Sequence, residues 1–383
     1  MCYMAKIVHF GKYYSPDVGG IESVTGSLAK AAVDAGHQVS VISFERTPAI
    51  RRSIIGGVYV TRAPVWKTLA SQPIAFGYIF ECVAAGTKAD IVHLHAPNML
   101  GALCALCLPK RVRLLVHWHS DVIDKGILAK LLRPLEFALL RRSNIIIATS
   151  QAYADSSARL ARFKEKLTVV AIGATSVKDR GAHSPLPQEL QEQVGGKKII
   201  LAVGRLVPYK GFDVLIAAAK SLEKDSVVVI VGGGPLKAEL HQAVELGGVK
   251  DRVVMAGRLS DDALHALFAR ATLFCLPSIF RAEAFGVVLL EAMSYGLPIV
   301  ASDIPGSGVP WVNQHGVSGL NVPVGNPKAL AEACNLILGS PEVQAKFADG
   351  ARQRFLAEFT EDVSASRMMG IYERLCAVSS GHP

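Results

Sequence analysis

The sequence of 383 residues contains no run of the roughly 18–20 apolar residues that a membrane-spanning helix requires. Residues 1–10 lead directly into an expected strand and lack the layout of a signal peptide. We therefore expect a protein that is neither integral to a membrane nor exported by that route. The seven cysteines are an odd number and lie scattered, so they predict no disulfide scaffold and favour a reducing cytoplasm.

Several motifs of nucleotide chemistry are also missing. No Asp-x-Asp occurs, which removes the commonest carboxylate clamp for the metal ion of a sugar nucleotide. The glycine-rich segment 231–235 lacks the Gly-Lys-Ser/Thr ending of a P-loop, and the first loop lacks Gly-x-Gly-x-x-Gly. NTP hydrolysis is therefore disfavoured. No basic motif interleaved with aromatic residues occurs either, so we expect no nucleic-acid partner.

The net charge of +9 comes from the first half of the chain. Residues 1–190 hold 23 Lys and Arg against 13 Asp and Glu, whereas residues 191–383 hold 18 against 19. Such a field suits an anionic surface or ligand. The leucines and cations of 126–142 suit a helix lying on anionic lipid. The alternative is an ordinary helix with a wide buried face, kinked or interrupted at Pro134.

Two series of alternating strand and helix patterns follow each other along the chain, separated by a polar stretch around 175–196 with Pro185, Pro187 and Gly195-Gly196. This order predicts an α/β fold of two doubly wound domains whose parallel strands point their carboxyl ends toward a shared cleft. The expected strands are 5–10, 38–44, 58–61, 90–95, 114–117, 145–149 and 167–171, then 198–203, 227–231, 253–255, 273–276 and 299–301. The expected helices are 21–35, 213–222, 236–246, 262–269 and 287–295, with a helical tail over 327–376.

The segment 278–293 is the strongest candidate for a functional site. It places Glu283 on a loop after a buried strand and Glu291 in the following helix, which begins near Gly286. The free N–H groups at a helix start provide a seat for a diphosphate. A carboxylate beside such a seat makes sense if it accepts hydrogen bonds from ligand hydroxyls. The alternative is an ordinary acid at a helix N-terminus, Glu283, and a solvated acid in the middle of the helix, Glu291.

Other loops at strand ends carry further candidates. Arg205 and Lys210 bring two cations to one loop, which suits stabilisation of a diphosphate leaving group. His117 and His119 alternate onto one side of a strand end, so a metal pair is conceivable. No third and fourth ligand presents itself with familiar spacing. A histidine that hydrogen-bonds a sugar hydroxyl is the better interpretation, with a core histidine as its rival.

Together these residues resemble glycosyltransferase family 4, a class of retaining enzymes with the two-domain GT-B fold. The resemblance rests on motifs that keep the family's order and spacing over nearly the whole chain: Gly19-Gly20, His119, Gly204-Arg205, Lys210-Gly211, Gly257-Arg258-Leu259 and Glu283-x7-Glu291. It implies an acceptor-binding Rossmann-like domain over 1–175, a linker over 176–197, a donor-binding domain over 198–360 and a helix over 361–383 that crosses back to the first domain. One departure is Ala171-Ile-Gly-Ala174, where many relatives carry a Pro-Asn-Gly-Val-Asp type of turn.

The resemblance also implies roles for individual residues. It makes Glu283, His119, Arg205 and Lys210 catalytic, with the two cations on the donor diphosphate and His119 on the donor sugar. It places Asp17 near the acceptor. The residues that it assigns to donor binding are Gly19, Gly20, Gly204, Arg258, Leu259, Ala284, Phe285, Gly286, Val287 and Glu291, the last on the ribose hydroxyls.

The finer match, in 281–286 and 306–313, is to bacterial enzymes that add mannose or D-rhamnose to a lipid-linked O-antigen. It implies a GDP-sugar donor, no obligatory metal or other cofactor, and a polyprenyl pyrophosphate glycan as acceptor. An enzyme with these partners would associate with an anionic membrane at its cytoplasmic face through the basic first domain. The retained configuration fits a front-face path, because no side chain is an obvious nucleophile.

Three other functions remain open at this point. A nucleotide-sugar epimerase uses the same architecture, a metal-dependent hydrolase would use His117 and His119, and a non-catalytic protein would bind a nucleotide sugar without transferring it. Incubation with donor alone separates the first, since only an epimerase releases a new sugar nucleotide. Chelators separate the second, and a transfer assay separates the third.

Overall fold

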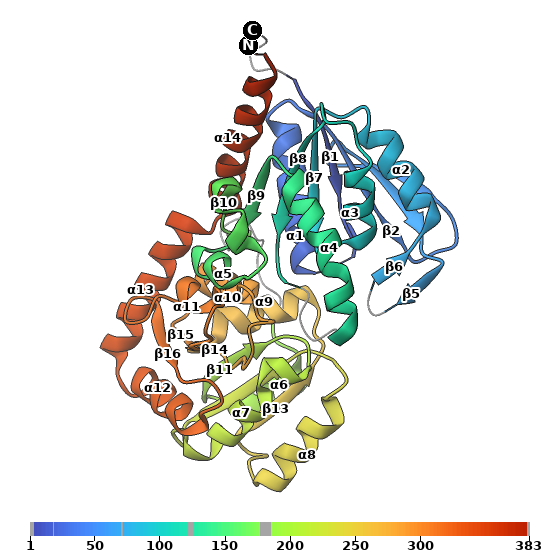
Figure 1. Cartoon of the computed structure of the whole chain (residues 1–383). Coiled ribbons are helices and arrows are strands. Elements are labelled where there is room, and N and C mark those ends of the chain that lie inside the picture. The colour runs from blue at the N-terminus through green and yellow to red at the C-terminus, as the bar shows by residue number, and fades with distance from the viewer. Residues whose placement is uncertain (1–3, 18, 70–71, 122–125, 177–184, 381–383) are drawn as a thin grey trace. The chain divides into compact units, whose positions relative to one another are not determined.

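The computed structural model describes residues 4–17, 19–69, 72–121, 126–176 and 185–380, without the side chains of 126–131 and 378–380 (Figure 1). The chain forms two compact units, which are described separately. Unit 1 comprises residues 1–173 and 361–383, and unit 2 comprises residues 174–360.

Unit 1 is built on an eight-stranded sheet in the order β10-β9-β8-β7-β1-β2-β4-β3. All neighbouring strands are parallel except β3 and β4. The strand order reverses between β1 and β7, which is where open parallel sheets bind ligands. The strands are β1 (Lys6–Phe10), β2 (Gln38–Glu45), β3 (Arg51–Ile55), β4 (Val58–Pro64), β7 (Ile91–Ala96), β8 (Arg113–Trp118), β9 (Ile145–Ala148) and β10 (Leu167–Val169).

The helices of unit 1 connect these strands, and a small antiparallel hairpin of β5 (Lys67–Leu69) and β6 (Gln72–Ile74) precedes the second helix. The last helix of the chain returns to this unit, where the Ser364 hydroxyl donates to the Ala171 carbonyl at 2.9 Å. The helices are α1 (Gly20–Asp34), α2 (Phe76–Gly86), α3 (Met99–Leu106), α4 (Gly126–Arg142), α5 (Gln151–Ser156) and α14 (Glu361–Ser380), with 3-10 turns at Leu160–Arg162 and Lys164–Lys166.

Unit 2 has a six-stranded, all-parallel sheet in the order β13-β12-β11-β14-β15-β16, and its order reverses between β11 and β14. Its strands are β11 (Lys198–Val203), β12 (Ser226–Val231), β13 (Val253–Gly257), β14 (Leu273–Leu276), β15 (Ile299–Ser302) and β16 (Gly319–Val322). Its helices are α6 (Gln188–Val194), α7 (Phe212–Ala218), α8 (Lys237–Gly247), α9 (Asp261–Arg270), α10 (Val287–Ser294), α11 (Val309–Val312), α12 (Pro327–Gly339) and α13 (Pro341–Glu358), with 3-10 turns at Pro208–Lys210 and Ala219–Ser221.

Local sequence explains why these elements form where they do. Every residue of β12, Ser-Val-Val-Val-Ile-Val, is buried, as expected for a strand covered on both faces. Helices α9, α12 and α13 begin after Ser260, Asn326 and Ser340, whose side chains each accept a hydrogen bond from the backbone three residues on. Side chains of α7 and α12 pack with those of the strands into one continuous core in unit 2.

The structure differs from the sequence-based predictions at several elements. Strand β3 and the β5–β6 hairpin were not predicted, and β3 breaks the parallel pattern. Helix α6 lies inside the predicted linker 176–197 and buries Leu190 and Val194 in unit 2, so its described part is no free linker. Helix α4 continues past Pro134 without interruption. None of the helices in the described residues is long and apolar enough to cross a membrane.

Candidate active site

A buried ion pair lies where the strand order of unit 2 reverses. Lys210 ends the 3-10 turn after β11, and Glu283 lies in the loop after β14. Lys210 Nζ is 2.5 Å from Glu283 Oε2, and each residue is only 8% exposed. The two charges thus face each other at the carboxyl edge of the sheet, the position at which open α/β sheets bind ligands.

The two loops that carry this pair are joined through their backbones. Ile279 N–H donates to the Tyr209 carbonyl at 2.8 Å. Gly211 has a φ of +63°, and a Cβ added there would lie 2.2 Å from the Pro277 carbonyl oxygen. Glycine is therefore required at 211, because only it allows both the left-handed turn and the close approach of the neighbouring loop.

Glu283 is positioned by more than its ion pair. The Ser278 hydroxyl donates to Oε2 at 3.1 Å, and the Ser307 hydroxyl donates to the Glu283 carbonyl. The next residue, Ala284, accepts from Gly308 N–H at 2.7 Å through its carbonyl. The other carboxylate oxygen, Oε1, accepts no hydrogen bond from the described residues. The side chain is thus held in place with one oxygen left for a ligand.

The start of helix α10 follows directly on this loop. Gly286 is its N-cap in the left-handed region, and Val287 is its first residue. The first N–H groups of a helix have no partner within it, and they carry the positive end of the helix dipole. Phe285, the residue before Gly286, is buried, and the centroid of its ring lies 6.1 Å from that of Trp311. The helix thus begins where the sequence predicted it, and the anion seat at its start stays a prediction.

The other candidate residues in unit 2 differ in their contacts and in how exposed they are. Gly204 lies against Lys210, since a Cβ added there would be 3.2 Å from Lys210 Cε. Arg258 is exposed but lies beside the glycine loop after β12, where a Cβ at Gly233 would be 2.7 Å from its Nε. Arg205 is exposed and makes no ion pair with a described residue. Leu259 and Glu291, the latter on α10, are half-buried.

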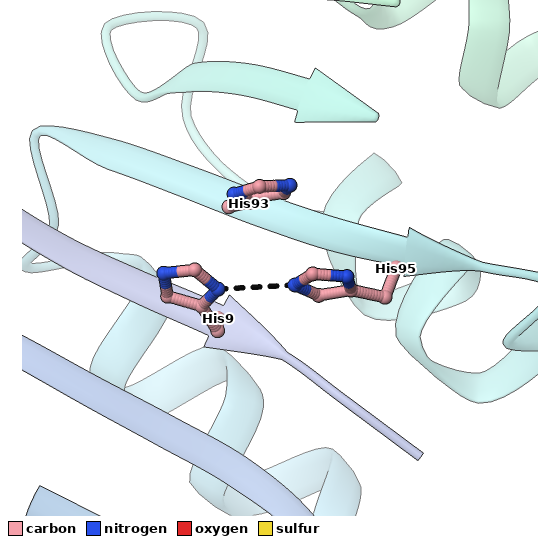
Figure 2. Close-up of side chains that lie close together, drawn as sticks. All are labelled: His9, His93 and His95. Carbon is pink, nitrogen blue, oxygen red and sulfur yellow. Dashed lines mark hydrogen bonds between the residues drawn. The ribbon is translucent and has the colours of Figure 1, made fainter. Parts of the chain in front are cut away.

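Unit 1 contains a cluster of five buried histidines at the centre of its sheet. Register places His9 of β1 opposite His93 of β7, and His95 of β7 opposite His117 of β8. His119 follows β8 and is 6% exposed, while the other four are at most 1% exposed. Figure 2 shows three members, in which His9 Nδ1 and His95 Nε2 lie 3.0 Å apart. The sequence-based prediction considered His117 and His119 but missed that the strand order brings the others to them.

Four of the histidines, His9, His93, His95 and His119, form a hydrogen-bonded chain with Tyr372 that ends at His119, whereas neither ring nitrogen of His117 has a hydrogen-bond partner among the described residues. His95 Nδ1 is 3.0 Å from His119 Nε2, and the rings of His9, His95 and His119 are tilted by only 20° and 14° from one to the next. At the other end, Tyr372 of α14 places its hydroxyl 2.6 Å from His93 Nδ1 and 3.4 Å from His9 Nε2. Burial lowers the pKa of both His9 and His119 to about 3, so the chain is neutral at physiological pH.

The nitrogen positions also indicate where the protons lie. His93 Nε2 is buried and has no hydrogen-bond partner in the described part of the chain. A buried nitrogen is better left unpaired as a lone pair than as an N–H, so His93 carries its proton on Nδ1 and donates to Tyr372. Tyr372 then donates to His9, His9 to His95 and His95 to His119. By this order His119 accepts at Nε2 and keeps its own proton on Nδ1.

The same cluster offers two sets of three nitrogens close enough to suggest a metal ion: His9, His93 and His95, and His95, His117 and His119. The ring orientations do not favour one. The rings of His117 and His119 are stacked at 4.1 Å with an angle of 11°, and those of His93 and His95 at 4.4 Å with 14°. A metal ion is bound in the plane of an imidazole ring, and stacked parallel rings do not direct their lone pairs to one point.

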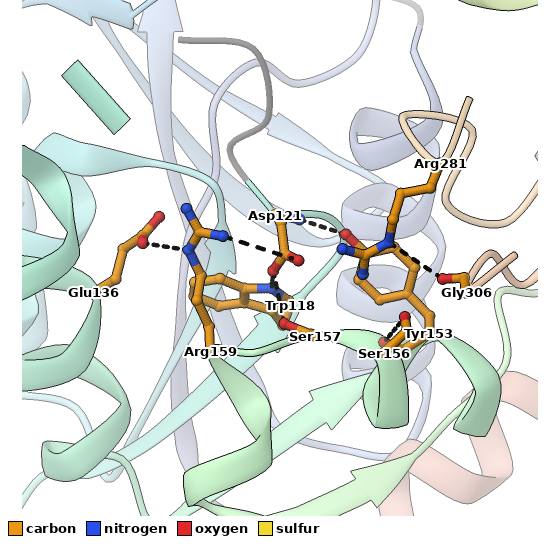
Figure 3. Close-up of polar contacts among 9 residues, drawn as sticks. All are labelled: Trp118, Asp121, Glu136, Tyr153, Ser156, Ser157, Arg159, Arg281 and Gly306. Atoms are coloured by element: carbon orange, nitrogen blue, oxygen red, sulfur yellow. Dashed lines mark hydrogen bonds and ion pairs between the residues drawn. The ribbon is translucent and has the colours of Figure 1, made fainter. Parts of the chain in front are cut away.

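The loop after His119 is fixed by Asp121. Its Oδ1 accepts from Trp118 Nε1 at 2.9 Å and from the Ser157 hydroxyl at 2.8 Å (Figure 3). Its backbone N–H donates to the Tyr153 hydroxyl at 2.6 Å. Arg159 lies 3.9 Å from the other carboxylate oxygen and is itself paired with a buried acid of α4. His119 is thus held from both sides, by the histidine chain and by this anchored loop.

Comparison with known proteins identifies the family to which the protein belongs. Residues 18–174 match the model of Glycosyltransferase Family 4, and residues 188–354 match that of glycosyl transferases group 1. The chain is 33% identical over 358 residues to the D-rhamnosyltransferase WbpZ of Pseudomonas aeruginosa, covering 93% of this chain and 92% of that protein. The chain belongs to glycosyltransferase family 4. It is also 30% identical to O-antigen chain mannosyltransferase C of Escherichia coli, covering 97% and 98%.

The fold of this glycosyltransferase is GT-B, as the sequence predicted. The structure of HepE from Anabaena in complex with UDP-glucose superimposes with a TM-score of 0.78, covering 97% of this chain and 100% of that one at 21% identity. At that identity the likeness concerns the fold alone. The described strands form two Rossmann-like units, each built on a mainly parallel sheet.

The remaining predicted residues of the glycosyltransferase lie in unit 1. Gly19 and Gly20 stand at the start of α1, where Gly19 is the N-cap in an extended conformation. The carboxylate of Glu22 folds back over Gly19, and burial raises its pKa. Asp17, the acceptor candidate, lies 3.4 Å from Arg46 Nε. These residues belong to the loop after β1, at the point where the strand order of unit 1 reverses.

Sequence reasoning missed the residues that hold the candidate site in place. Ser278 opens the functional segment and Ser307 lies between two glycines, yet neither spacing indicated that both would bond to Glu283. Tyr372 was unremarked in the helical tail, although its hydroxyl begins the histidine chain. A buried tyrosine in a terminal helix carries no sequence signal of a partner so distant in the chain.

The order of protons in this chain makes a testable prediction. In Tyr372→Phe, His9 Nε2 loses its donor and keeps a bare lone pair, which costs less than the bare N–H that a reversed order would place there. We therefore expect His119 to carry its proton on Nδ1, and not on Nε2, in both wild type and Tyr372→Phe. Long-range ¹H–¹⁵N correlation spectra of histidine-labelled protein distinguish these two tautomers. Tyr78→Phe is the matched control, because Tyr78 is equally buried and its hydroxyl donates to the Gly11 carbonyl, which is not part of the hydrogen-bonded histidines. A wild-type His119 that carries its proton on Nε2 would contradict the assignment.

Proposed function

We propose that this glycosyltransferase moves a hexose, mannose or D-rhamnose, from a GDP-sugar onto a lipid-linked glycan of a cell-surface polysaccharide. The buried Lys210–Glu283 pair beside the start of α10 is the observation that carries the proposal. It combines a cation for a diphosphate with a fixed carboxylate for sugar hydroxyls. The two relatives named above, a D-rhamnosyl- and an O-antigen mannosyltransferase, support the choice of sugar and acceptor.

Each group has a task in the transfer. The backbone N–H groups at the start of α10 and the ammonium of Lys210 bind the diphosphate, and Arg205 adds a second cation from the same loop as Lys210. These groups stabilise the negative charge that grows as the bond between the sugar and the phosphate breaks. Glu283 Oε1 accepts from the sugar hydroxyls, while Glu291 holds the ribose. His119 binds the donor sugar through its Nδ1–H.

We expect the anomeric configuration to be retained along a front-face path. The acceptor oxygen forms its bond to the anomeric carbon on the face from which the diphosphate leaves. The electron pair of the broken bond goes to the diphosphate, and the proton of the acceptor hydroxyl goes to a phosphate oxygen. Lys210 and Ser278 draw negative charge to Oε2 of Glu283, which lowers the nucleophilicity of the carboxylate, and its free Oε1 is assigned to the sugar hydroxyls and not to the anomeric carbon.

A transfer assay tests this function. Purified enzyme, GDP-mannose or GDP-D-rhamnose and a polyprenyl pyrophosphate glycan are combined after treatment with EDTA, and the configuration of the new linkage is determined by NMR. We expect an α-linked product at an unchanged rate without metal. Inverted configuration, a trapped glycosyl–enzyme adduct or loss of activity with EDTA would contradict the mechanism. Release of a new sugar nucleotide without acceptor would instead identify an epimerase.

A further inference from the structure

An exposed aromatic face lies on unit 1, defined here by Ile50, Trp66, Phe76 and Phe80. The three aromatic residues are 72%, 62% and 74% exposed. Trp66 precedes the β5–β6 hairpin. The centroid of its ring lies 6.0 Å from that of Phe76. Phe80 lies one turn further along α2, and Ile50 lies against the same helix, since its Cδ1 would be 3.5 Å from a Cβ at Gly77. Phe76 and Phe80 are four residues apart on α2 and so lie on the same side of the helix, next to Trp66. Figure 1 shows α2 and the β5–β6 hairpin, the elements that carry or adjoin these residues.

Cations surround this aromatic face. Arg51 and Arg52 begin β3 directly after Ile50, and the exposed Lys67 follows Trp66. Arg52 pairs with Glu81 of α2, and Arg51 lies 3.8 Å from Glu45. The two arginines also line a hollow of about 420 Å³ next to the face. Its lining holds four arginines against two acids: Asp17, Glu45, Arg46, Arg51, Arg52 and Arg62, with Pro16 and Ser53.

The chemistry of the face favours one occupant over others. Neighbouring exposed aromatic side chains on a protein surface mark a binding site for an apolar partner or a membrane. Tryptophan and phenylalanine beside arginine and lysine are the side chains that enter the interface of a bilayer with anionic lipids. The excess of positive charge in residues 1–190 acts in the same direction.

We propose that the aromatic face inserts into an anionic membrane while the arginine-lined hollow takes a lipid phosphate. This inference rests on the proposed function, because a lipid-linked acceptor lies in such a membrane. It assigns the contact to α2 and Trp66 instead of 126–142. In its described part, α4 turns Glu136, Leu139 and Leu140 into the core of unit 1. The first side chains of that helix lie outside the described residues.

Vesicle binding tests the proposal with a variant that changes only exposed side chains. Trp66→Ser/Phe76→Ser/Phe80→Ser removes the aromatic residues of the face, and Leu246→Ser/Leu336→Ser/Leu356→Ser is the matched control on unit 2. Sedimentation uses vesicles of phosphatidylcholine with and without phosphatidylglycerol. Wild type and control are expected to bind the anionic vesicles. The aromatic variant is expected to bind at least tenfold more weakly, and quenching by brominated lipid is expected to be lost with Trp66.

Three outcomes would overturn the proposal. The aromatic variant binds as tightly as wild type, the wild type binds neutral and anionic vesicles equally, or it binds neither. If the wild type binds neither kind of vesicle, the aromatic face would instead be a binding site for another protein. Transfer to a short, water-soluble acceptor glycan keeps this test separate from the proposed function. That activity should be equal in wild type and the aromatic variant, and its absence from both would reject the proposed function while the vesicle result stands.

Discussion

Replacing Lys210 with alanine is expected to lower kcat of sugar transfer by about 10²–10³-fold, because the leaving diphosphate loses its buried cation. Glu283→Gln is expected to have a comparable effect. It keeps the shape of the side chain but removes the charge that orients Lys210. The exposed pair of Lys198 and Asp225, 3.0 Å apart, provides the control: Lys198→Ala should change neither kcat nor KM by more than a few-fold.

Stability separates this effect from simple unfolding. Lys210→Ala leaves Glu283 buried and unpaired, which costs roughly 3–5 kcal/mol of unfolding free energy. The double variant Lys210→Met/Glu283→Gln carries no buried charge, so it should recover most of this stability but none of the activity. Chemical denaturation and initial rates measure the two quantities. A double variant that regains transfer together with stability would show that the pair is only structural.

Acid is expected to destabilise unit 1 far more than unit 2. Burial lowers the pKa of all five clustered histidines, that of His9 and His119 to about 3, while the unfolded chain titrates at its ordinary value near 6.5. Below pH 6.5 the unfolded state therefore binds more protons. The stability that the neutral cluster contributes is present above pH 6.5 and is lost as the pH falls toward 3.

The expected size of this loss is large. Each buried histidine costs up to roughly 1.4 kcal/mol per pH unit below 6.5, so five together approach 7 kcal/mol per unit. That is comparable to the whole stability of a typical domain. Hydrogen exchange at pH 7 and pH 5, corrected for the intrinsic exchange rates, measures the protection of backbone amides in each unit separately. We expect loss of protection in β1, β7 and β8 and little change in β11 and β12, and equal loss in both units would contradict the assignment.

The sequence predicted those parts of the fold that have a local signal. Buried parallel strands such as β12 and β14 are continuous apolar runs between turn residues, so they were found in place. Strand β3 begins with two arginines at the edge of the sheet and has no buried residue, so nothing in its pattern distinguishes it from a loop. Helix α6 is short, lies between prolines and glycines, and buries only Leu190 and Val194.

The candidate site was predictable as a list of residues but not as an arrangement. Spacing placed Lys210 and Glu283 in loops after buried strands. Their contact follows from the reversal that sets β11 beside β14, although two other strands intervene in sequence. The histidine cluster has the same origin, since β1, β7 and β8 are neighbours only in the folded sheet. Long-range strand order therefore decides which predicted residues meet.

The most direct measurement of the central claim compares the protection that nucleotide sugars give against heat unfolding. A panel of GDP-, UDP- and dTDP-sugars is added to wild-type protein and to the Lys210→Ala and Lys198→Ala variants. Bound ligand raises Tm in proportion to the logarithm of its concentration. We predict that a GDP-sugar raises Tm of wild type and Lys198→Ala and that this shift is lost in Lys210→Ala. An equal shift in all three proteins, or no shift with any donor, would contradict the placement of the donor site at Lys210 and Glu283.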